Sequence, residues 1–437
     1  GAQTVQRVDI AAGVGVDAGT IGLDDSVDGT RQGSLILDSD MLNSFGLGGL
    51  KISALESVEV NDALQLADGG ELGLFAKRVD INADLTVRAG VIEAGNVRRQ
   101  VNASSAAIDV YLDPQDQQGS LRVADGVHLD ASGRWSNQLL DADAGTLAAW
   151  RDGGRISLRN GGDVVLGDGS LLDVSSGASI GADGERRGGK GGDITLHASA
   201  STALAATGAL QLGGELRGLG MTGAGTLSLR SGRVNIGGSA TDESDDTLYL
   251  APEQFSLGFA HYKINGQAGL EVAEGTQVQV TRPVWRWTEN ASEVSGSDPG
   301  GRALEAWTPP LYQEDPLAGV LTQRAGASLA LQVGGDVASL VDAASQTLTL
   351  GEGSLLQVDP GQSIRLRGPG QITVLGSLLA HGGSIDIRQQ QFGDIDPLEN
   401  EVLGDNQANA RSIWIGEQAL LDVSGQALSL IHISEPT

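Results

Sequence analysis

Apolar and polar side chains alternate along this chain in short runs that glycine interrupts. One unit begins at Gly48 (GGLKISALESVEVNDALQLAD), the next begins at Gly69 (GGELGLFAKRVDINADLTVRA), and another glycine follows at position 90. Within these units the alternating apolar residues are Leu50, Ile52, Val58, Val60, Leu64, Leu66, Leu72, Leu74, Val79, Ile81, Leu85 and Val87. Alternation with a period of two predicts short strands with one buried face. The interval between Gly48 and Gly69 recurs between Gly361 and Gly382.

A second pattern places a small turn before the sequence Leu-Leu-Asp-Val-Ser-Gly. It occurs in full or in part in Gly167–Gly177, Gly416–Gly425, Ala124–Gly133 and Gly351–Gly361. Shorter units with an apolar residue at every second position occur at Ile156–Leu158, Ile194–Leu196, Leu227–Leu229 and Ile364–Leu366. Recurrence at such a short period is typical of stacked-repeat folds.

These repeats predict an all-β chain that forms a right-handed, single-stranded parallel β-helix. A unit of about three short strands cannot bury its apolar face alone, whereas stacked units pair each strand in parallel with its copies above and below. Roughly 16 rungs of ~21 residues would extend on the order of 80 Å at ~4.8 Å per rung. The glycines are expected at corners that require positive φ. A β-sandwich is disfavoured because hairpin signals such as Asn265-Gly266 are scarce.

The rhythm of the repeats divides the chain into four parts. We expect β-helix repeats in residues 1–240, one extra-helical insertion or subdomain in residues 241–325, and β-helix repeats again in residues 326–428. Residues 429–437 (SLIHISEPT) follow no repeat phase and look like translated sequencing-adapter sequence. We interpret this last segment as a non-native tail.

Proline and tryptophan are concentrated in the predicted insertion. It contains six of the 11 prolines and three of the six tryptophans: Pro252, Pro283, Pro299, Pro309, Pro310, Pro316, Trp285, Trp287 and Trp307. Proline does not suit the interior of a strand ladder. Two interpretations are open: the tryptophans form a binding surface with nearby arginines on a projecting loop, or they cover an apolar flank of the coil. Trp135 and Trp414 lie within repeats and are expected to pack as caps or to fill rungs.

Composition narrows the class of protein. The chain of 437 residues has 65 Gly, 40% hydrophobic residues and only 3% aromatic residues, so its core must consist of thin aliphatic layers. The net charge of −28 repels phosphate backbones and argues against nucleic-acid binding. The absence of Cys excludes thiol chemistry and disulfides. No apolar run reaches the roughly 18 residues of a membrane-spanning helix, so we expect no transmembrane segment.

Several stretches, in their order along the chain, resemble the filamentous-haemagglutinin-like exoproteins of two-partner secretion. The matching stretches are Ser39–Asn43, Gly133–Asp141, Gly189–Leu196, Glu215–Gly238, Leu270–Val280, Gly368–Ile385 and Ser412–Gly425. The family's secretion domain carries Asn-Pro-rich motifs, and this chain has no Asn-Pro. Because the chain also begins at Gly1 rather than Met, we expect an internal fragment.

The resemblance implies a large secreted β-helical adhesin or structural stalk with a pectin-lyase-like fold. It implies a location at the cell surface of a Gram-negative bacterium, in association with the outer membrane. The expected partners are an outer-membrane two-partner secretion transporter and an unidentified glycan or protein ligand on host or bacterial surfaces. The expected role is attachment, biofilm formation or contact-dependent competition.

A polysaccharide-degrading β-helix enzyme of the pectin lyase or polygalacturonase type is the alternative. Such an enzyme needs clustered carboxylates for acid and base chemistry, together with a pattern resembling NTD, DD, HG and RIK. NTD and RIK are missing, and Asp245-Asp246 and His381-Gly382 lie far apart along the chain. No acidic run is aligned with a basic residue at rung spacing, as a lyase would require. We therefore predict no enzyme and assign no catalytic residue.

Metal and cofactor sites are not predicted either. Gly188–Leu196 (GGKGGDITL) resembles one calcium-binding nonapeptide, but Thr195 stands where a large apolar residue is expected and no tandem copy follows. A glycine-rich turn leading into a strand is the better interpretation. The acidic run Asp242–Asp246 is interpreted as a solvated loop. Four scattered histidines lack metal-binding spacing: His128, His197, His261 and His381.

Overall fold

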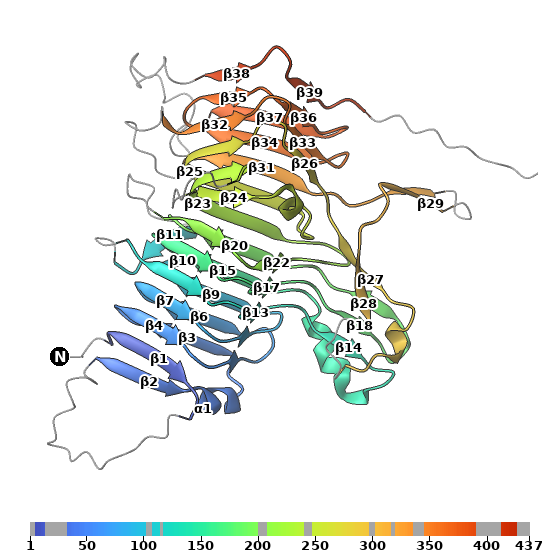
Figure 1. Ribbon diagram of the computed structural model, residues 1–437. Coiled ribbons are helices and arrows are strands. Elements are labelled where there is room, and N and C mark those ends of the chain that lie inside the picture. Colours follow the sequence, from blue (N-terminus) through green and yellow to red (C-terminus); the bar gives the residue numbers. More distant parts are fainter. Residues whose placement is uncertain are drawn as a thin grey trace, which may run out of the picture.

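The computed structural model shows a nearly all-β chain whose strands stack into a parallel β-helix (Figure 1). This confirms the predicted fold class. The structure describes residues 5–13, 33–101, 107–113, 117–199, 208–239, 247–296, 302–315, 320–334, 345–389 and 412–425. The acidic run Asp242–Asp246 and the predicted tail 429–437 lie outside the described residues.

Three stacks of strands form the faces of the coil. The first runs in the order β2 (Ser34–Asp38), β1 (Arg7–Ala11), β4 (Ser57–Val60), β7 (Arg78–Ile81), β12 (Ser120–Val123), β16 (Asp163–Leu166) and β21 (Leu210–Leu212). The second runs through β3 (Gly49–Ser53), β6 (Glu71–Phe75), β9 (Val91–Gly95), β15 (Arg155–Arg159), β20 (Asp193–His197), β23 (Thr226–Ile236), β25 (His261–Val272), β31 (Ser328–Val333), β34 (Ser363–Gly368) and β37 (Ser384–Gln389). The third contains β5 (Leu64–Gln65), β8 (Leu85–Thr86), β13 (His128–Asp130), β17 (Leu171–Asp173) and β22 (Glu215–Arg217).

The faces rearrange in the C-terminal half of the coil. The long strands β23 and β25 are paired along both of their halves, and their second halves also pair with separate short strands. Those short strands, together with the ones that stack on them, are β24 (Thr247–Leu250), β32 (Thr347–Leu350), β35 (Ile372–Val374) and β38 (Ile413–Ile415). A separate four-stranded sheet contains β26 (Gln277–Val280), β33 (Leu355–Val358), β36 (Ser377–Leu379) and β39 (Leu420–Asp422).

The stacked strands are parallel and in register, so equivalent residues form continuous interior columns. Ile364 pairs with Ile385, at the offset that the glycine repeat predicted. One column contains, in order, Leu50, Leu72, Ile92, Ile156, Ile194, Leu227, Tyr262, Leu329, Ile364 and Ile385. All of these except the two end members are buried. The core is therefore mainly a set of aliphatic columns, as the low aromatic content predicted, with one aromatic cluster formed by Phe255, Phe259 and Tyr262.

The expectation of roughly 16 rungs is wrong, because most rungs are longer than the predicted repeat. Ile156 pairs with Ile194, nearly two repeat lengths along the chain, and Tyr262 pairs with Leu329, more than three repeat lengths along. The extra residues lie in loops and side structures outside the coil. The main path of the second stack contains ten strands among the described residues. At ~4.8 Å per strand, this corresponds to a height on the order of 45 Å.

Many of the glycines serve close packing rather than positive φ, which corrects part of the sequence interpretation. Gly69 has φ +73°, as expected for a corner. The glycines that begin the second-face strands, in contrast, are stacked on one another. A Cβ on Gly154 would lie 1.9 Å from the carbonyl oxygen of Gly90, and one on Gly192 would lie 1.8 Å from that of Gly154. Only glycine lets each rung approach the carbonyl group of the rung below.

The predicted insertion at 241–325 is too wide. Strands β24, β25 and β26 lie within it but pair with the strands of neighbouring rungs. Pro252, which suggested a break, begins the short 3-10 helix η2 (Pro252–Phe255) between two such strands. The segment that leaves the coil contains two antiparallel hairpins and a 3-10 turn: β27 (Val284–Trp287) with β28 (Leu304–Trp307), β29 (Tyr312–Asp315) with β30 (Val320–Gln323), and η3 (Ala291–Glu293).

The insertion is also not the only departure from the coil, because residues 1–240, which we had predicted to be repeats, contain others. A three-stranded sheet consists of β14 (Trp135–Asn137), β18 (Ala178–Ile180) and β19 (Arg186–Gly188), and η1 (Ala142–Trp150) follows β14. A separate antiparallel hairpin is formed by β10 (Val97–Val101) and β11 (Ala107–Tyr111). These segments account for much of the excess rung length.

A short helix, α1 (Ser39–Ser44), covers the edge of the third face. The side-chain amide of Asn43 donates to the Ala63 carbonyl oxygen at 3.0 Å and accepts from the Gln65 backbone N–H at 2.8 Å. Leu42 is buried in the core beneath it. The amide thus occupies hydrogen-bonding groups of β5 that a further strand would use, which protects an otherwise open sheet edge.

We predict that Gly192→Ala destabilises the coil by about 3 kcal/mol, because the new methyl group would overlap the Gly154 carbonyl oxygen. Gly48→Ala is the matched control at the exposed start of the same series, where an added Cβ meets nothing within 4 Å. Urea unfolding followed by circular dichroism measures both. Equal midpoints for the two variants would contradict the close packing of the glycines.

Candidate functional site

Several of the departures from the coil gather at one side of it, as Figure 1 shows for β14, β18, β27 and β28, whereas the β10–β11 hairpin lies on another side. We call residues 134–151, 178–188, 284–296 and 302–307 the lateral module. The ranges 284–296 and 302–307 both belong to the predicted insertion, so the module is built from three regions of the chain. Side-chain contacts join these regions. Because rigid scaffolds commonly present binding residues on such projections, the module is the candidate binding region of this protein.

Three side chains of the first region clamp the insertion in place. The buried Asn137 side-chain amide donates to the carbonyl oxygens of Ser292 and Val294, both at 3.0 Å. The Trp135 indole N–H donates to the Ser295 carbonyl oxygen at 3.1 Å. Asp141 accepts from the Ser295 hydroxyl at 2.9 Å and from the Gly296 backbone N–H at 2.7 Å. The insertion is therefore fixed to the module through its own backbone.

The module has a small apolar core of its own. Ala291, Val294 and Ala303 are buried, and Trp135, Trp287 and Leu304 pack against them. The Trp135 and Trp287 rings meet edge to face, with centroids 5.9 Å apart. Two cation–π contacts lie at the edge of this core. The Arg186 guanidinium carbon is 5.4 Å from the Trp287 ring centroid, and the Arg286 guanidinium carbon is 5.1 Å from the Trp307 ring centroid.

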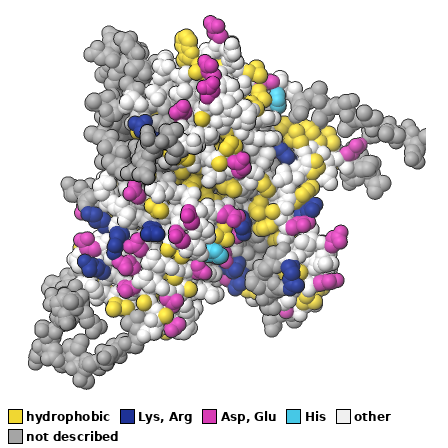
Figure 2. All heavy atoms as spheres, in the orientation of Figure 1, with side chains coloured by type: hydrophobic (Ala, Val, Ile, Leu, Met, Phe, Trp, Pro, Cys, Tyr) yellow, Lys and Arg dark blue, Asp and Glu magenta, His cyan; other side chains and the backbone are white. Residues whose placement is uncertain are grey.

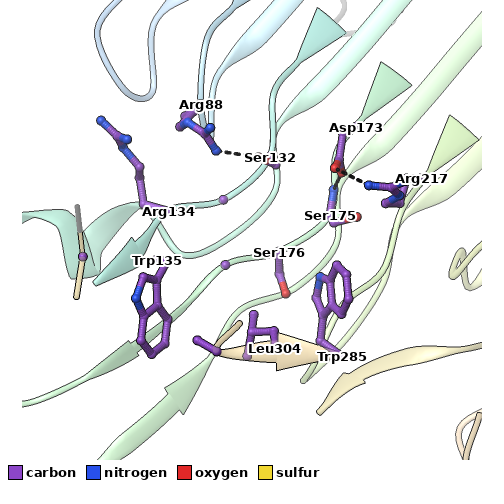
Figure 3. A pocket seen from close by; sticks show the side chains of 14 residues that line it. Arg88, Ser132, Arg134, Trp135, Asp173, Ser175, Ser176, Arg217, Trp285 and Leu304 are labelled. Carbon is purple, nitrogen blue, oxygen red and sulfur yellow. Dashed lines mark hydrogen bonds and ion pairs between the residues drawn. The ribbon is translucent and has the colours of Figure 1, made fainter. Parts of the chain in front are cut away.

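A cleft of about 200 Å³ lies between the module and the coil (Figure 3). We call it the tryptophan cleft and define it by Trp135, Ser176, Trp285 and Leu304. Figure 3 shows the Ser176 side chain in the space between the two indoles. The Trp285 backbone N–H donates to the Gly220 carbonyl oxygen at 3.2 Å, which anchors this residue to the coil.

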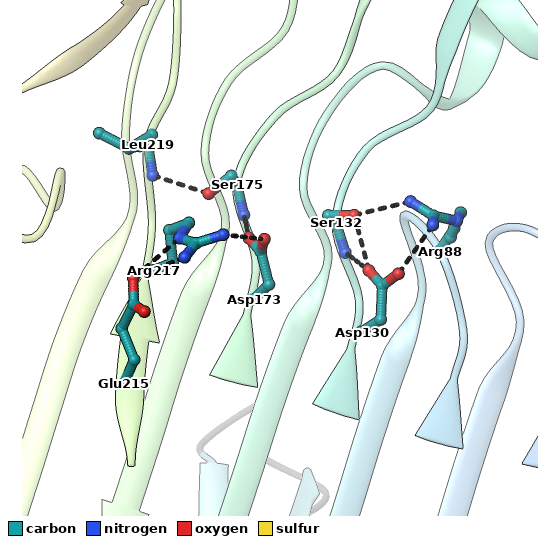
Figure 4. Close-up of polar contacts among 8 residues, drawn as sticks. All are labelled: Arg88, Asp130, Ser132, Asp173, Ser175, Glu215, Arg217 and Leu219. Atoms are coloured by element: carbon teal, nitrogen blue, oxygen red, sulfur yellow. Dashed lines mark hydrogen bonds and ion pairs between the residues drawn. The ribbon is translucent and has the colours of Figure 1, made fainter. Parts of the chain in front are cut away.

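The coil side of the cleft is built by the recurring Leu-Asp-x-Ser sequence (Figure 4). Asp130 accepts a hydrogen bond from the Ser132 backbone N–H at 2.9 Å, and Asp173 accepts one from the Ser175 backbone N–H at 2.7 Å. The same contact recurs at Asp422. These are Asx turns, in which the carboxylate replaces a backbone acceptor and turns the chain. The repeated motif is thus explained by a corner of the coil.

Arginines from neighbouring rungs pair with these corner carboxylates (Figure 4). Arg88 lies 2.9 Å from Asp130, while Arg217 lies 3.7 Å from Asp173 and 2.6 Å from Glu215. Burial raises the pKa of the Asp173 carboxyl, and its hydrogen bonds from Ser175 and the charge of Arg217 oppose that rise. The charges at this corner are therefore largely compensated within the protein.

The two corner carboxylates suggest a test of the enzyme alternative. Asp130 and Asp173 occupy equivalent positions in adjacent rungs. Each one, however, accepts from a backbone N–H and faces an arginine. Glycoside hydrolysis needs one carboxyl group free to donate a proton and another free to attack or to activate water. Asp173 lines the cleft and Asp130 lies behind Ser132, and both groups are already engaged in the corner structure.

The histidines considered as candidates lie on different strands and corners of the described coil. Asp245-Asp246 lies outside the described residues, and His381 lies 3.7 Å from Asp422 at another corner. His197 contacts the Ser228 hydroxyl at 2.9 Å. The described residues contain no cluster of three or more His, Asp or Glu suited to a metal ion. Every described helix is too short or too polar to traverse a lipid bilayer.

The glycine-rich segment before Asp193 leads into strand β20, as interpreted from the sequence. The Asp193 carboxylate accepts from the Thr226 backbone N–H at 2.7 Å in the next rung. Trp414 lies in strand β38 of the coil and is 58% exposed. Trp135, expected to cap or fill a rung, lies in the lateral module and packs against Trp287. One feature of the sequence could have revealed the extra chain that forms this module. Leu129 and its partner Leu172 are separated along the chain by about twice the expected repeat.

We predict that Asn137→Ala loosens the attachment of β27 and β28 while leaving the coil folded. Two carbonyl oxygens lose their donor, at a cost of ~1–3 kcal/mol, so local amide exchange should accelerate by about tenfold or more. Hydrogen–deuterium exchange with mass spectrometry measures this over residues 284–296 and 302–307. The control is Asn61→Ala, which removes an exposed contact to Asp9 and should leave the module unchanged. Unaltered exchange in the Asn137 variant would show that the clamp is not what holds the insertion.

Comparison with known proteins does not assign a family to this chain. No family model, no curated protein and no solved structure matches it. The fold therefore rests on the register of the strands, and the resemblance to two-partner secretion exoproteins remains an interpretation of the sequence.

Proposed function

We propose that this protein is a secreted or surface-exposed β-helical adhesin or structural stalk of a two-partner secretion system. It would act in attachment, biofilm formation or contact-dependent competition at the surface of a Gram-negative bacterium. Its partners would be an outer-membrane transporter and a glycan or protein ligand on another surface. The observation that carries the proposal is the lateral module, which is clamped to a stacked coil and forms a cleft lined by two tryptophans.

The physical properties of the coil suit a stalk. Each rung is held by backbone ladders to the rungs on both sides, so the stack resists bending and can propagate its fold from one end. The chain has no Cys, so folding after export would need no disulfide formation. Loops and side structures can vary outside the coil without disturbing the interior columns.

The chain is acidic as a whole, but many of its basic side chains are paired with carboxylates of neighbouring rungs on the outside of the coil. Figure 2 shows acidic and basic side chains interspersed over the face in view. Ion pairs link neighbouring rungs, as between Lys51 and Glu71 at 2.9 Å and between Arg155 and Glu93 at 3.1 Å. The enzyme alternative has weaker support, because the corner carboxylates Asp130 and Asp173 already have partners.

We predict that the purified full chain binds to the surface of bacterial or epithelial cells through the module. Fluorescently labelled protein should be retained on cells, and Asn137→Ala should reduce retention by about fivefold because the cleft loses one wall. Flow cytometry measures retention, with Asn61→Ala as the matched control.

Incubation with polygalacturonate and calcium should release no unsaturated ends. Absence of retention on either cell type, or release of such ends, would count against an adhesive role.

A further inference from the structure

The tryptophan cleft contains polar atoms that have no hydrogen-bond partner among the described residues. They are the Ser176 hydroxyl and the Trp285 indole N–H, and both are buried. Ser176 is only 5% exposed. A buried polar group without a partner costs stability, and native proteins contain few of them. Both residues line the cleft, so a ligand bound there can supply the missing partners.

The walls of the cleft are flat, apolar and held in place. Trp135 is fixed by its hydrogen bond to Ser295 and its edge contact with Trp287. Trp285 is anchored through its backbone to Gly220. Rigid indoles offer large contact areas at little cost in conformational entropy. A ligand with a flat C–H face and hydroxyl groups at its edge would match these walls and the Ser176 hydroxyl.

The charges around the cleft favour a neutral ligand. Arg88 and Arg217 pair with corner carboxylates, as described above. The third lining arginine, Arg134, lies 2.8 Å from Asp68. An anionic ligand would have to displace one of these carboxylates, and a cationic ligand would have to displace an arginine. The three lining arginines therefore offer neither an anionic nor a cationic ligand a charge that lacks a counter-ion within the protein.

The size of the cleft limits how much of a ligand it can enclose. Its volume of about 200 Å³ is smaller than the several hundred Å³ typical of sites that enclose a drug-sized molecule. One sugar ring fits such a space, and the rest of an oligosaccharide would extend outward.

We propose that the tryptophan cleft binds a terminal sugar residue of a neutral oligosaccharide. The sugar ring packs against the Trp135 and Trp285 indoles, and its hydroxyl groups hydrogen-bond with the Ser176 hydroxyl and the Trp285 indole N–H. This inference rests on the proposed adhesive function and names the ligand class of the same module.

The test is calorimetric titration of the full chain with chitotetraose, lactose and maltotetraose, and in parallel with trigalacturonate and choline. We expect binding of at least one neutral sugar, with little dependence on salt concentration. Ser176→Ala and Trp285→Phe should each weaken it about tenfold. Trp414→Phe, at the far end of the coil, is the matched control and should bind normally.

Thermal unfolding separates a ligand role from a structural one. Removing the Ser176 hydroxyl removes a buried polar group without a partner, so Ser176→Ala should melt at the same temperature or higher while binding less. Binding of no neutral sugar, preference for trigalacturonate or choline, or unchanged binding by both cleft variants would each overturn the proposal. If the Ser176→Ala and Trp285→Phe variants still bind cells as the parent chain does, adhesion stands and the assigned ligand class fails.

Discussion

The structure depends on one constraint: neighbouring turns of the chain must pair their backbones in parallel and in register, at the spacing of adjacent β-strands. This spacing stacks each residue on its equivalent in the next rung. Aliphatic residues accordingly form the column from Leu50 to Ile385, with Tyr262 as its one aromatic member, and glycines such as Gly154 and Gly192 stack where a side chain would meet a carbonyl oxygen. The many glycines and the few aromatic residues both follow from this requirement.

The same constraint decides where a binding site can form. Long insertions within a strand would break the ladders on both sides, and the structure tolerates only a local register shift there, between β23 and β25; the larger side structures leave the coil between strands. The lateral module does so beside the corners formed by Asp130 and Asp173, whose Asx turns preserve the path of the coil. Within the module, the side chains of Asn137 and Trp135 hydrogen-bond to the backbone of the insertion, which comes from a distant part of the chain. These bonds hold the insertion in place. The cleft is a consequence of side structures from distant parts of the chain meeting beside these corners.

Sequence reasoning could identify the fold because the repeat is local. The offset from Ile364 to Ile385 and the alternation within each unit are visible in the sequence, and the structure places these residues side by side. The number of rungs could not be predicted, because rung length varies with loops that carry no periodic signal. The cleft could not be predicted either. Trp135, Ser176 and Trp285 form no motif, and only the folded coil brings them together.

The in-register parallel stack can be tested directly with introduced pairs of cysteines. Because the chain contains no Cys, any intramolecular disulfide in such a variant must join the two introduced residues. Ser157 and Thr195 are partners in adjacent rungs, and Ser228 is the partner of Thr195 in the next one. At ~4.8 Å per rung, only adjacent partners lie within the ~4.4–6.8 Å between Cα atoms that a disulfide spans. Under mild oxidation, mass spectrometry should therefore detect an intramolecular disulfide in the Ser157→Cys/Thr195→Cys variant and none in the Ser157→Cys/Ser228→Cys variant. A disulfide in the second variant, or its absence from the first, would contradict the stack.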